Sequence, residues 1–178
     1  LARKLNYPIL CDVLSQVRNG YHDKGLIVDA YDAFLRDGNL ARSLTPEIVI
    51  RFGSLPVSKP LVQYLEQNRQ SYQILIDEFD GWRDPDRVIS RVLHVDPVSF
   101  CLDVSSRINN PPRLGNWTDA WLNLSEISDQ LLNMDDMCKD LFEENGPQDS
   151  QNLRTQHWSL DWPFSFNMQI IELYASEL

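Results

Sequence analysis

The sequence has no apolar run that approaches the roughly 20 residues needed to cross a bilayer, which predicts a soluble chain. It also has no excess of positive charge, because 16 Lys and Arg stand against 26 Asp and Glu, for a formal charge of −10. Nucleic acids and anionic membranes repel a surface of net negative charge. The balance therefore argues against nucleic acid or a membrane as the main partner.

Cysteine is scarce as well. The three cysteines, Cys11, Cys101 and Cys138, are far apart and odd in number, which argues against a disulfide framework. A reducing compartment fits this pattern better than an oxidising one. We therefore predict a cytoplasmic protein.

Several short motifs of catalysis and ligand binding are absent. The seven glycines are scattered, and neither G-x-G-x-x-G nor a Walker lysine motif follows a predicted strand, which argues against dinucleotide binding. A G-x-S-x-G motif for acyl transfer is also missing. The three histidines, His22, His94 and His157, have no ligand-like spacing with one another or with cysteine, which argues against a metal site built from them.

The composition of the whole chain is that of a globular domain. Its 178 residues are 43% apolar and 24% charged, which suits one domain with a core of its own. The first residues, Leu1 to Leu5, include neither an initiator Met nor a signal peptide and are typical of the last turn of a helix. We therefore predict that the sequence is a fragment.

Short apolar runs alternate with amphipathic stretches over the first two thirds of the chain. The apolar runs predict strands at residues 7–12, 47–53, 71–77 and 88–95, and helical spacing predicts helices at residues 27–35 and 59–67. This alternation indicates βαβ units, and near-continuous apolar strands indicate burial on both faces. The sequence therefore predicts an α/β fold for residues 1–110, a Rossmann-like parallel sheet with helices on both faces.

The pattern changes after Pro112. Residues 116–144 are acidic and have apolar side chains at helical spacing, namely Trp117, Trp121, Leu124, Ile127, Leu131 and Leu132. A polar linker at 146–155 and a further helix at 166–178 follow. We predict a C-terminal helical extension at 111–145, and a linker with the start of another domain at 146–178.

Function in such sheets lies beyond the carboxyl ends of the strands, which are followed here by loops 12–24, 53–59 and 77–86. In the second loop, Ser58 can cap the following helix. Lys59 places a cation near that helix N-terminus, where the helix dipole disfavours it. An anionic ligand or a carboxylate beside Lys59 would explain this placement.

The third loop gathers carboxylates. They are Asp77, Glu78, Asp80, Asp84 and Asp86. A Mg²⁺ or Ca²⁺ site is one interpretation, because both ions prefer oxygen ligands. A solvated acidic turn that ends at Asp84-Pro85 is the favoured one.

Three segments resemble one enzyme family, in the same order along the chain. They are residues 51–61 (RFGSLPVSKPL), 7–18 (YPILCDVLSQVR) and 77–85 (DEFDGWRDP). Residues 1–96 are similar to the middle domain of the 2-succinyl-5-enolpyruvyl-6-hydroxy-3-cyclohexene-1-carboxylate synthases. These are thiamine-diphosphate-dependent enzymes of menaquinone and phylloquinone biosynthesis. The resemblance continues weakly from Asn116.

The resemblance implies a three-domain transferase that decarboxylates 2-oxoglutarate and adds the resulting unit to isochorismate. It implies that the first strand of the middle domain precedes Leu1 and that the next domain begins near Phe166. It further implies that flanking pyrimidine- and diphosphate-binding domains bind thiamine diphosphate and Mg²⁺. The fragment itself is then expected to bind no cofactor and to lack activity, and the full enzyme is expected to be a homo-oligomer.

The resemblance also implies a role for the loop before Lys59. By position, Lys59 is the basic residue that helps to bind an acidic substrate or intermediate, and Pro60 follows it where some relatives carry Arg. Ser58, Arg18 and Arg83 are further substrate-binding candidates. For Arg18 a surface turn is the favoured interpretation, and for Arg83 an ion pair within the domain. No catalytic, cofactor-binding or metal-binding residue is predicted.

Two alternatives remain open at the level of sequence. One is a non-catalytic ligand-sensing or scaffold module with a Rossmann-like fold. The other is a different thiamine-diphosphate enzyme, such as a decarboxylase or an acetolactate synthase, although these usually lack the pattern of residues 56–59.

Overall fold

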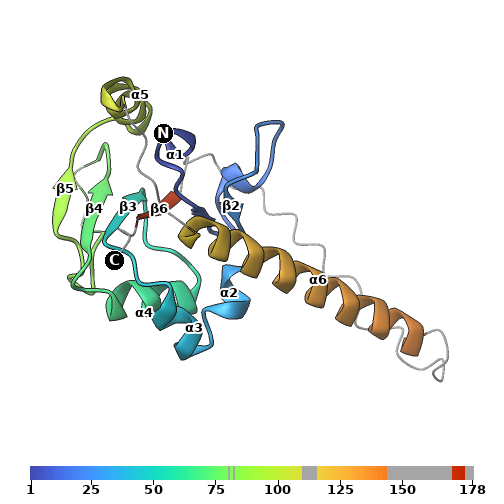
Figure 1. The fold of residues 1–178 in the computed structure, drawn as a ribbon. Helices are drawn as coiled ribbons and strands as arrows, with labels where there is room; N and C mark the ends of the chain where they lie inside the picture. The colour runs from blue at the N-terminus through green and yellow to red at the C-terminus, as the bar shows by residue number, and fades with distance from the viewer. Residues whose placement is uncertain (80, 82, 110–115, 144–169, 175–178) are drawn as a thin grey trace.

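The computed structural model describes residues 1–79, 81, 83–109, 116–143 and 170–174, and for residues 134–143 and 170–174 it describes only the backbone. Six strands form one sheet in the order β2-β1-β6-β3-β4-β5 (Figure 1). The strands are β1 (Ile9–Cys11), β2 (Ile27–Val28), β3 (Ile48–Phe52), β4 (Tyr72–Ile76), β5 (Arg91–Leu93) and β6 (Ile170–Tyr174). The α-helices are α1 (Ala2–Leu5), α2 (Tyr31–Phe34), α3 (Gly38–Ser43), α4 (Lys59–Gln67), α5 (Pro97–Arg107) and α6 (Trp117–Glu143).

The strands from the first two thirds of the chain all run in one direction. β1 pairs with β2 in parallel, and β3, β4 and β5 pair in parallel with one another. β6 pairs antiparallel with both β1 and β3, so these two groups share one orientation. The predicted α/β fold with a parallel sheet is confirmed, and an antiparallel strand at its centre is an addition.

Helices cover both faces of this sheet, as predicted (Figure 1). On one face, Val49 of β3 packs with side chains of α2, α3, α4 and α6, including Phe34, Leu61 and Trp121. On the other face, Ile50 and Phe52 pack against Phe100 and Cys101 of α5. Successive side chains of a strand point to opposite faces, so one apolar strand supplies both cores.

The helix predicted at residues 27–35 is wrong over its first part. Ile27 and Val28 form strand β2, in register with Ile9 and Leu10 of β1, and α2 begins only at Tyr31. The β-branched pair favours an extended backbone, and the neighbouring strand provides its hydrogen-bond partners. The remaining helical residues make a single turn.

The helix predicted at residues 166–178 is also wrong for the residues that the structure describes there. Residues 170–174 form β6, in register with Leu10 and with Ile50 of β3. The segment IIELY is rich in β-branched and aromatic residues, and the edges of β1 and β3 provide backbone partners on both sides. The linker predicted at 146–155 lies outside the described residues.

Helix α6 confirms the predicted helix at 116–144 to within a residue at each end. Trp121 is fully buried and meets Phe34 and Tyr64 edge-on, with ring centroids 5.6 and 5.7 Å away. Farther along the helix, Ile127 and Leu131 are exposed. The predicted apolar stripe therefore packs against the sheet domain only at its beginning.

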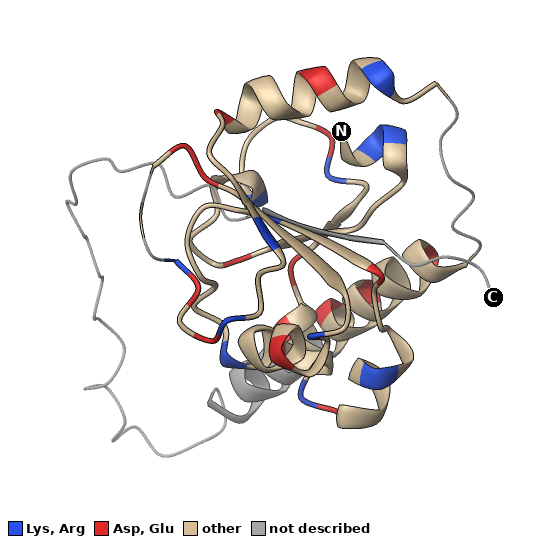
Figure 2. Ribbon diagram, turned by 90° about the vertical axis from the view of Figure 1, so that its left-hand side faces the viewer, with Lys and Arg blue, Asp and Glu red and all other residues tan. Residues whose placement is uncertain are grey.

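Among the described residues, no helix is both long and apolar enough to cross a membrane. Acidic and basic residues lie on several helices and loops around the sheet (Figure 2). Cys11, at the end of β1, is a buried free thiol.

Candidate substrate-binding site

A cavity of about 360 Å³ lies where the chain leaves β1, β2 and the loop that follows β3. Three segments line it, which are the loop after β1 (Asp12, Val13, Arg18), the segment after β2 (Asp29, Tyr31, Asp32, Arg36) and the turn into α4 (Val57, Ser58, Lys59, Pro60). The carboxyl ends of parallel strands meet at one edge of a sheet, which is why these distant segments converge.

The cations of the cavity differ in what they contact. Arg18 lies 3.6 Å from Asp29, and Arg36 lies 2.6 Å from Asp32. Lys59 is exposed, and no hydrogen bond or ion pair of its ammonium group is found within the described part of the chain. Lys59 is therefore the cation of this cavity that is available to an external carboxylate.

Asp12 is the buried carboxylate of the site. It follows β1 directly and is 1% exposed. Its Oδ2 accepts hydrogen bonds from the backbone N–H groups of Val57, at 2.8 Å, and Ser58, at 3.4 Å. Its Oδ1 accepts one from Leu14 N at 3.1 Å. These bonds tie the loop after β1 to the turn that leads into α4.

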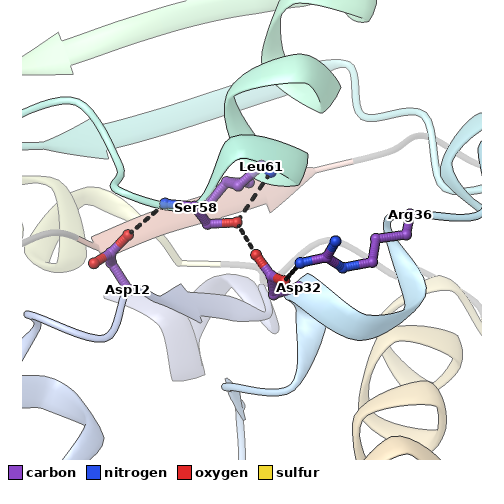
Figure 3. A network of polar contacts seen from close by, with 5 residues as sticks. All are labelled: Asp12, Asp32, Arg36, Ser58 and Leu61. Carbon is purple, nitrogen blue, oxygen red and sulfur yellow. Dashed lines mark hydrogen bonds and ion pairs between the residues drawn. The ribbon is translucent and has the colours of Figure 1, made fainter.

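Ser58 joins the same network through its side chain (Figure 3). Its hydroxyl donates to Asp32 Oδ1 at 2.6 Å and accepts from Leu61 N at 3.2 Å, which caps α4. The cap confirms the sequence expectation for this residue. Pro60 lies in the first turn, where its missing N–H removes no helical bond.

Asp32 is held ionised by its partners. Burial alone would raise the pKa of this carboxyl, but the hydrogen bonds from Ser58 and Arg36 and the charge of Arg36 outweigh it, so the pKa lies below its ordinary value. Asp32 therefore stays a carboxylate at neutral pH, acting as acceptor for both neighbours.

A second cavity, of about 380 Å³, lies on the other side of Lys59 and Arg36. Both residues and Pro60 line the two cavities, and the second one adds Leu35, Gly38, Gln63, Tyr64 and Gln67. Lys59 therefore lines both cavities, and its flexible side chain can reach a ligand in either one.

Three of the four predicted binding residues line one cavity. They are Lys59, Ser58 and Arg18. Arg83 lies in another cluster, where its Nε is 2.5 Å from Asp77 Oδ2 and its Nη1 donates to Ser54 Oγ. This is the ion pair within the domain that the sequence favoured for Arg83. Ligand binding by any of the four stays a prediction.

The Arg83 cluster also includes a buried arginine on β3. Arg51 is 1% exposed, and its Nη2 donates to the carbonyl oxygen of Arg83 at 2.6 Å. Burial lowers the pKa of Arg51, although the charges of Asp84 and Asp86 act in the opposite direction. The hydrogen bond from Arg51 therefore anchors the loop after β4 to strand β3.

Sequence reasoning missed Asp12, Asp32 and Arg36 as site residues. Asp12 had a signal, since it is the first polar residue after a buried strand. Asp32 and Arg36 are four residues apart, the spacing of an ion pair on one helix face. Their approach to Ser58 depends on the tertiary fold and leaves no trace in local sequence.

Two carboxylates of the acidic turn after β4, those of Asp77 and Asp84, make structural contacts. Asp84 accepts the backbone N–H groups of Val88 and Ile89, both at 3.0 Å. Among residues 1–79, 81, 83–109 and the described remainder, no group of three or more His, Cys, Asp or Glu is placed to hold a metal ion.

A diphosphate group, which the resemblance implies for the complete enzyme, does not fit the start of α4. Proteins hold such groups with unoccupied N–H groups at a helix N-terminus and with a metal ion. At the start of α4, the N–H groups of Val57 and Ser58 already donate to Asp12. These two N–H groups are therefore not available to a diphosphate.

Comparison with known proteins gives a consistent result. The family described as "Middle domain of thiamine pyrophosphate" matches residues 1–145. A 2-succinyl-5-enolpyruvyl-6-hydroxy-3-cyclohexene-1-carboxylate synthase of Bacillus velezensis is 40% identical over 156 residues, which are 86% of this chain and 26% of the relative. The synthase of the same name from Chloroflexus aurantiacus is 40% identical over 134 residues, 74% of this chain and 23% of the relative.

A third synthase of that name, from Geobacillus thermodenitrificans, is 39% identical over 132 residues, 74% of this chain and 22% of the relative. The chain spans about a quarter of the length of the curated relatives it matches. The family match covers strands β1 to β5, the α-helices and the whole candidate site, and β6 lies beyond it. The chain belongs to the family of thiamine pyrophosphate enzyme middle domains, as its sequence predicts.

Proposed function

We propose that this chain is the central domain of a thiamine-diphosphate-dependent synthase, a transferase that decarboxylates 2-oxoglutarate and adds the resulting unit to isochorismate. The names of the relatives support this reaction. The decarboxylation chemistry belongs to thiamine diphosphate, which with Mg²⁺ is bound by the flanking pyrimidine- and diphosphate-binding domains. The chain by itself then binds neither and is inactive.

Within that enzyme, Lys59 binds a carboxylate of the substrate or of an acidic intermediate. The observation that carries this role is the position of Lys59 between two cavities, without an internal partner among the described residues. Both substrates are carboxylic acids, and a charge-assisted hydrogen bond to a carboxylate is stronger than a neutral one. Arg18 and Ser58 line the same cavity and complete its polar wall.

The net negative charge of the chain makes Lys59 a local exception at which an anion can bind. The formal charge of −10 repels anions in general, whereas Lys59, which has no ion-pair partner among the described residues, attracts them locally. The role of this domain is therefore to present one cation at the substrate and to pack against its neighbours. We place the enzyme in the cytoplasm, as a homo-oligomer, in menaquinone or phylloquinone biosynthesis.

The test is Lys59→Ala in the complete enzyme, with steady-state kinetics for each acidic substrate. Loss of a charged hydrogen bond predicts a KM about tenfold higher or more for one of them. Lys24→Ala is the matched control, because Lys24 is an exposed lysine that does not line the cavity. Unchanged KM values for both substrates would overturn the role of Lys59.

A further inference from the structure

The start of α4 has the geometry of an anion-binding position. A strand, a short loop and a nine-residue helix follow one another at β3, residues 53–58 and α4. Backbone N–H groups converge at such a turn and attract anions. In this chain, the group found there is the carboxylate of Asp12, which lies 45 residues from Val57 in sequence.

Burial increases the importance of the hydrogen bonds between Asp12 and the turn before α4. Asp12 is 1% exposed, and a buried carboxylate is costly unless hydrogen bonds compensate its charge. Among the described residues, its compensating donors are the N–H groups of Leu14, Val57 and Ser58. The carboxylate gives the two N–H groups of the turn an acceptor, and these N–H groups compensate the buried charge of the carboxylate.

We propose that Asp12 is an internal anion that binds the two backbone N–H groups directly before α4 and thereby positions Lys59 for the external anion. This inference rests on the proposed function, because it takes Lys59 as the residue that binds the acidic ligand. Asp12 touches no substrate in this scheme. It is a positioning residue, which acts through the backbone of the turn.

Two consequences follow from the geometry. First, a ligand carboxylate cannot use the N–H groups of Val57 and Ser58 and is directed to the ammonium group of Lys59. Second, the backbone directly before Lys59 is held on both sides, because Asp32 fixes the Ser58 hydroxyl while Asp12 holds the amides (Figure 3). Only the side-chain torsions of Lys59 remain free, which lowers the entropy cost of binding.

The test uses Asp12→Asn in the complete enzyme. An amide has one acceptor oxygen, so in either orientation its NH₂ group faces a backbone N–H that Asp12 now accepts. We expect the KM for the acidic substrate that Lys59 binds to rise about tenfold, with kcat largely kept. Asp96→Asn is the control, because Asp96 also accepts a backbone N–H at a helix start, on α5.

A double-mutant cycle shows whether Asp12 acts through Lys59. If it does, Asp12→Asn adds nothing to KM once Lys59 is alanine. A KM that rises by the product of the two single effects overturns the proposal. If Lys59→Ala alone leaves KM unchanged, the proposed function fails instead, so the two failures are distinguishable.

Chemical rescue gives a second readout, which loss of stability would not produce. Asp12→Ala leaves room for a small carboxylate, and added formate should lower the KM of this variant without changing that of Lys59→Ala. No response to formate, in a variant shown to be folded by its thermal transition, counts against the internal anion. If neither Asp12 variant folds, Asp32→Ala removes the acceptor of the Ser58 hydroxyl and must raise the same KM.

Discussion

The Ser58 hydroxyl donates to Asp32 Oδ1 at 2.6 Å, across 26 residues of sequence. This contact joins the N-terminal cap of α4 to α2, and Arg36 contacts the other oxygen of the same carboxylate. One ionised side chain therefore orients the turn before Lys59. The arrangement ties the geometry of the cavity to the charge of Asp32.

The first prediction concerns pH. The pKa of Asp32 is depressed by its hydrogen bonds and by Arg36, which outweigh the opposing effect of burial. Its contribution to stability is therefore present above the ordinary carboxyl pKa of 3.8 and is lost as the pH falls through the lower pKa of the folded state. We expect the difference in free energy of unfolding between the wild type and Asp32→Asn to shrink below about pH 4.

Urea unfolding of the two proteins at a series of pH values measures this difference. Glu66→Gln is a suitable control, because Glu66 lies on α4 outside the network. A difference that stays constant between neutral and acidic pH would contradict the assigned role of Asp32.

The second prediction concerns Trp121, the side chain of α6 that is fully buried in the core. Trp121→Ala removes ring contacts with Phe34, Tyr64 and Trp117 and leaves a large cavity, which costs about 3–5 kcal/mol of unfolding free energy. Ile127→Ala on the same helix is the control. Ile127 is 53% exposed, so its truncation should change stability by about 0.5 kcal/mol or less.

Chemical denaturation monitored by circular dichroism compares the two variants. Equal losses would mean that α6 does not pack through Trp121. A loss confined to Trp121→Ala supports the finding that, among the described side chains of α6, those at its beginning belong to the core of the sheet domain.

The third prediction concerns thiol reactivity. Burial raises the pKa of the Cys11 thiol from 9.0 to about 12, an effect that the charge of Arg18 only partly offsets. The thiolate is the reactive species, so Cys11 should resist iodoacetamide at pH 8 in the folded protein. Cys101 is partly exposed and should be modified first.

Peptide mapping by mass spectrometry after timed labelling distinguishes the two cysteines. In denaturant, both should react at similar rates, which controls for intrinsic reactivity. Rapid modification of Cys11 under native conditions would show that the end of β1 opens readily.

Local sequence was sufficient to predict the elements whose apolar pattern matches their burial in the fold. Helix α4 has the predicted bounds, because Ser58 caps it, Pro60 suits its first turn and its apolar residues lie on one face. Strands β3 and β4 lie within their predicted ranges, because continuous apolar residues suit burial on both faces. Lys59 was also identified from sequence, by its placement at a helix start and by family resemblance.

The errors fall where a short segment depends on a partner. Ile27 and Val28 are a two-residue strand that exists because β1 lies beside it, and local periodicity favours a helix there. Residues 170–174 are extended because they pair with strands on both sides. In both places the backbone hydrogen bonds come from residues distant in sequence, which a local pattern does not contain.

The sequence by itself determined the α/β class, the bounds of α4 and the position of one cation after a buried strand. Only the tertiary structure decided what surrounds that cation. Asp12, Asp32 and Ser58 meet because the carboxyl ends of parallel strands lie at one edge of the sheet. Neither the spacing of these residues in the sequence nor their types predict the contact. Burial then gives the contact its strength, since a buried carboxylate must find hydrogen-bond donors and the start of a helix offers them.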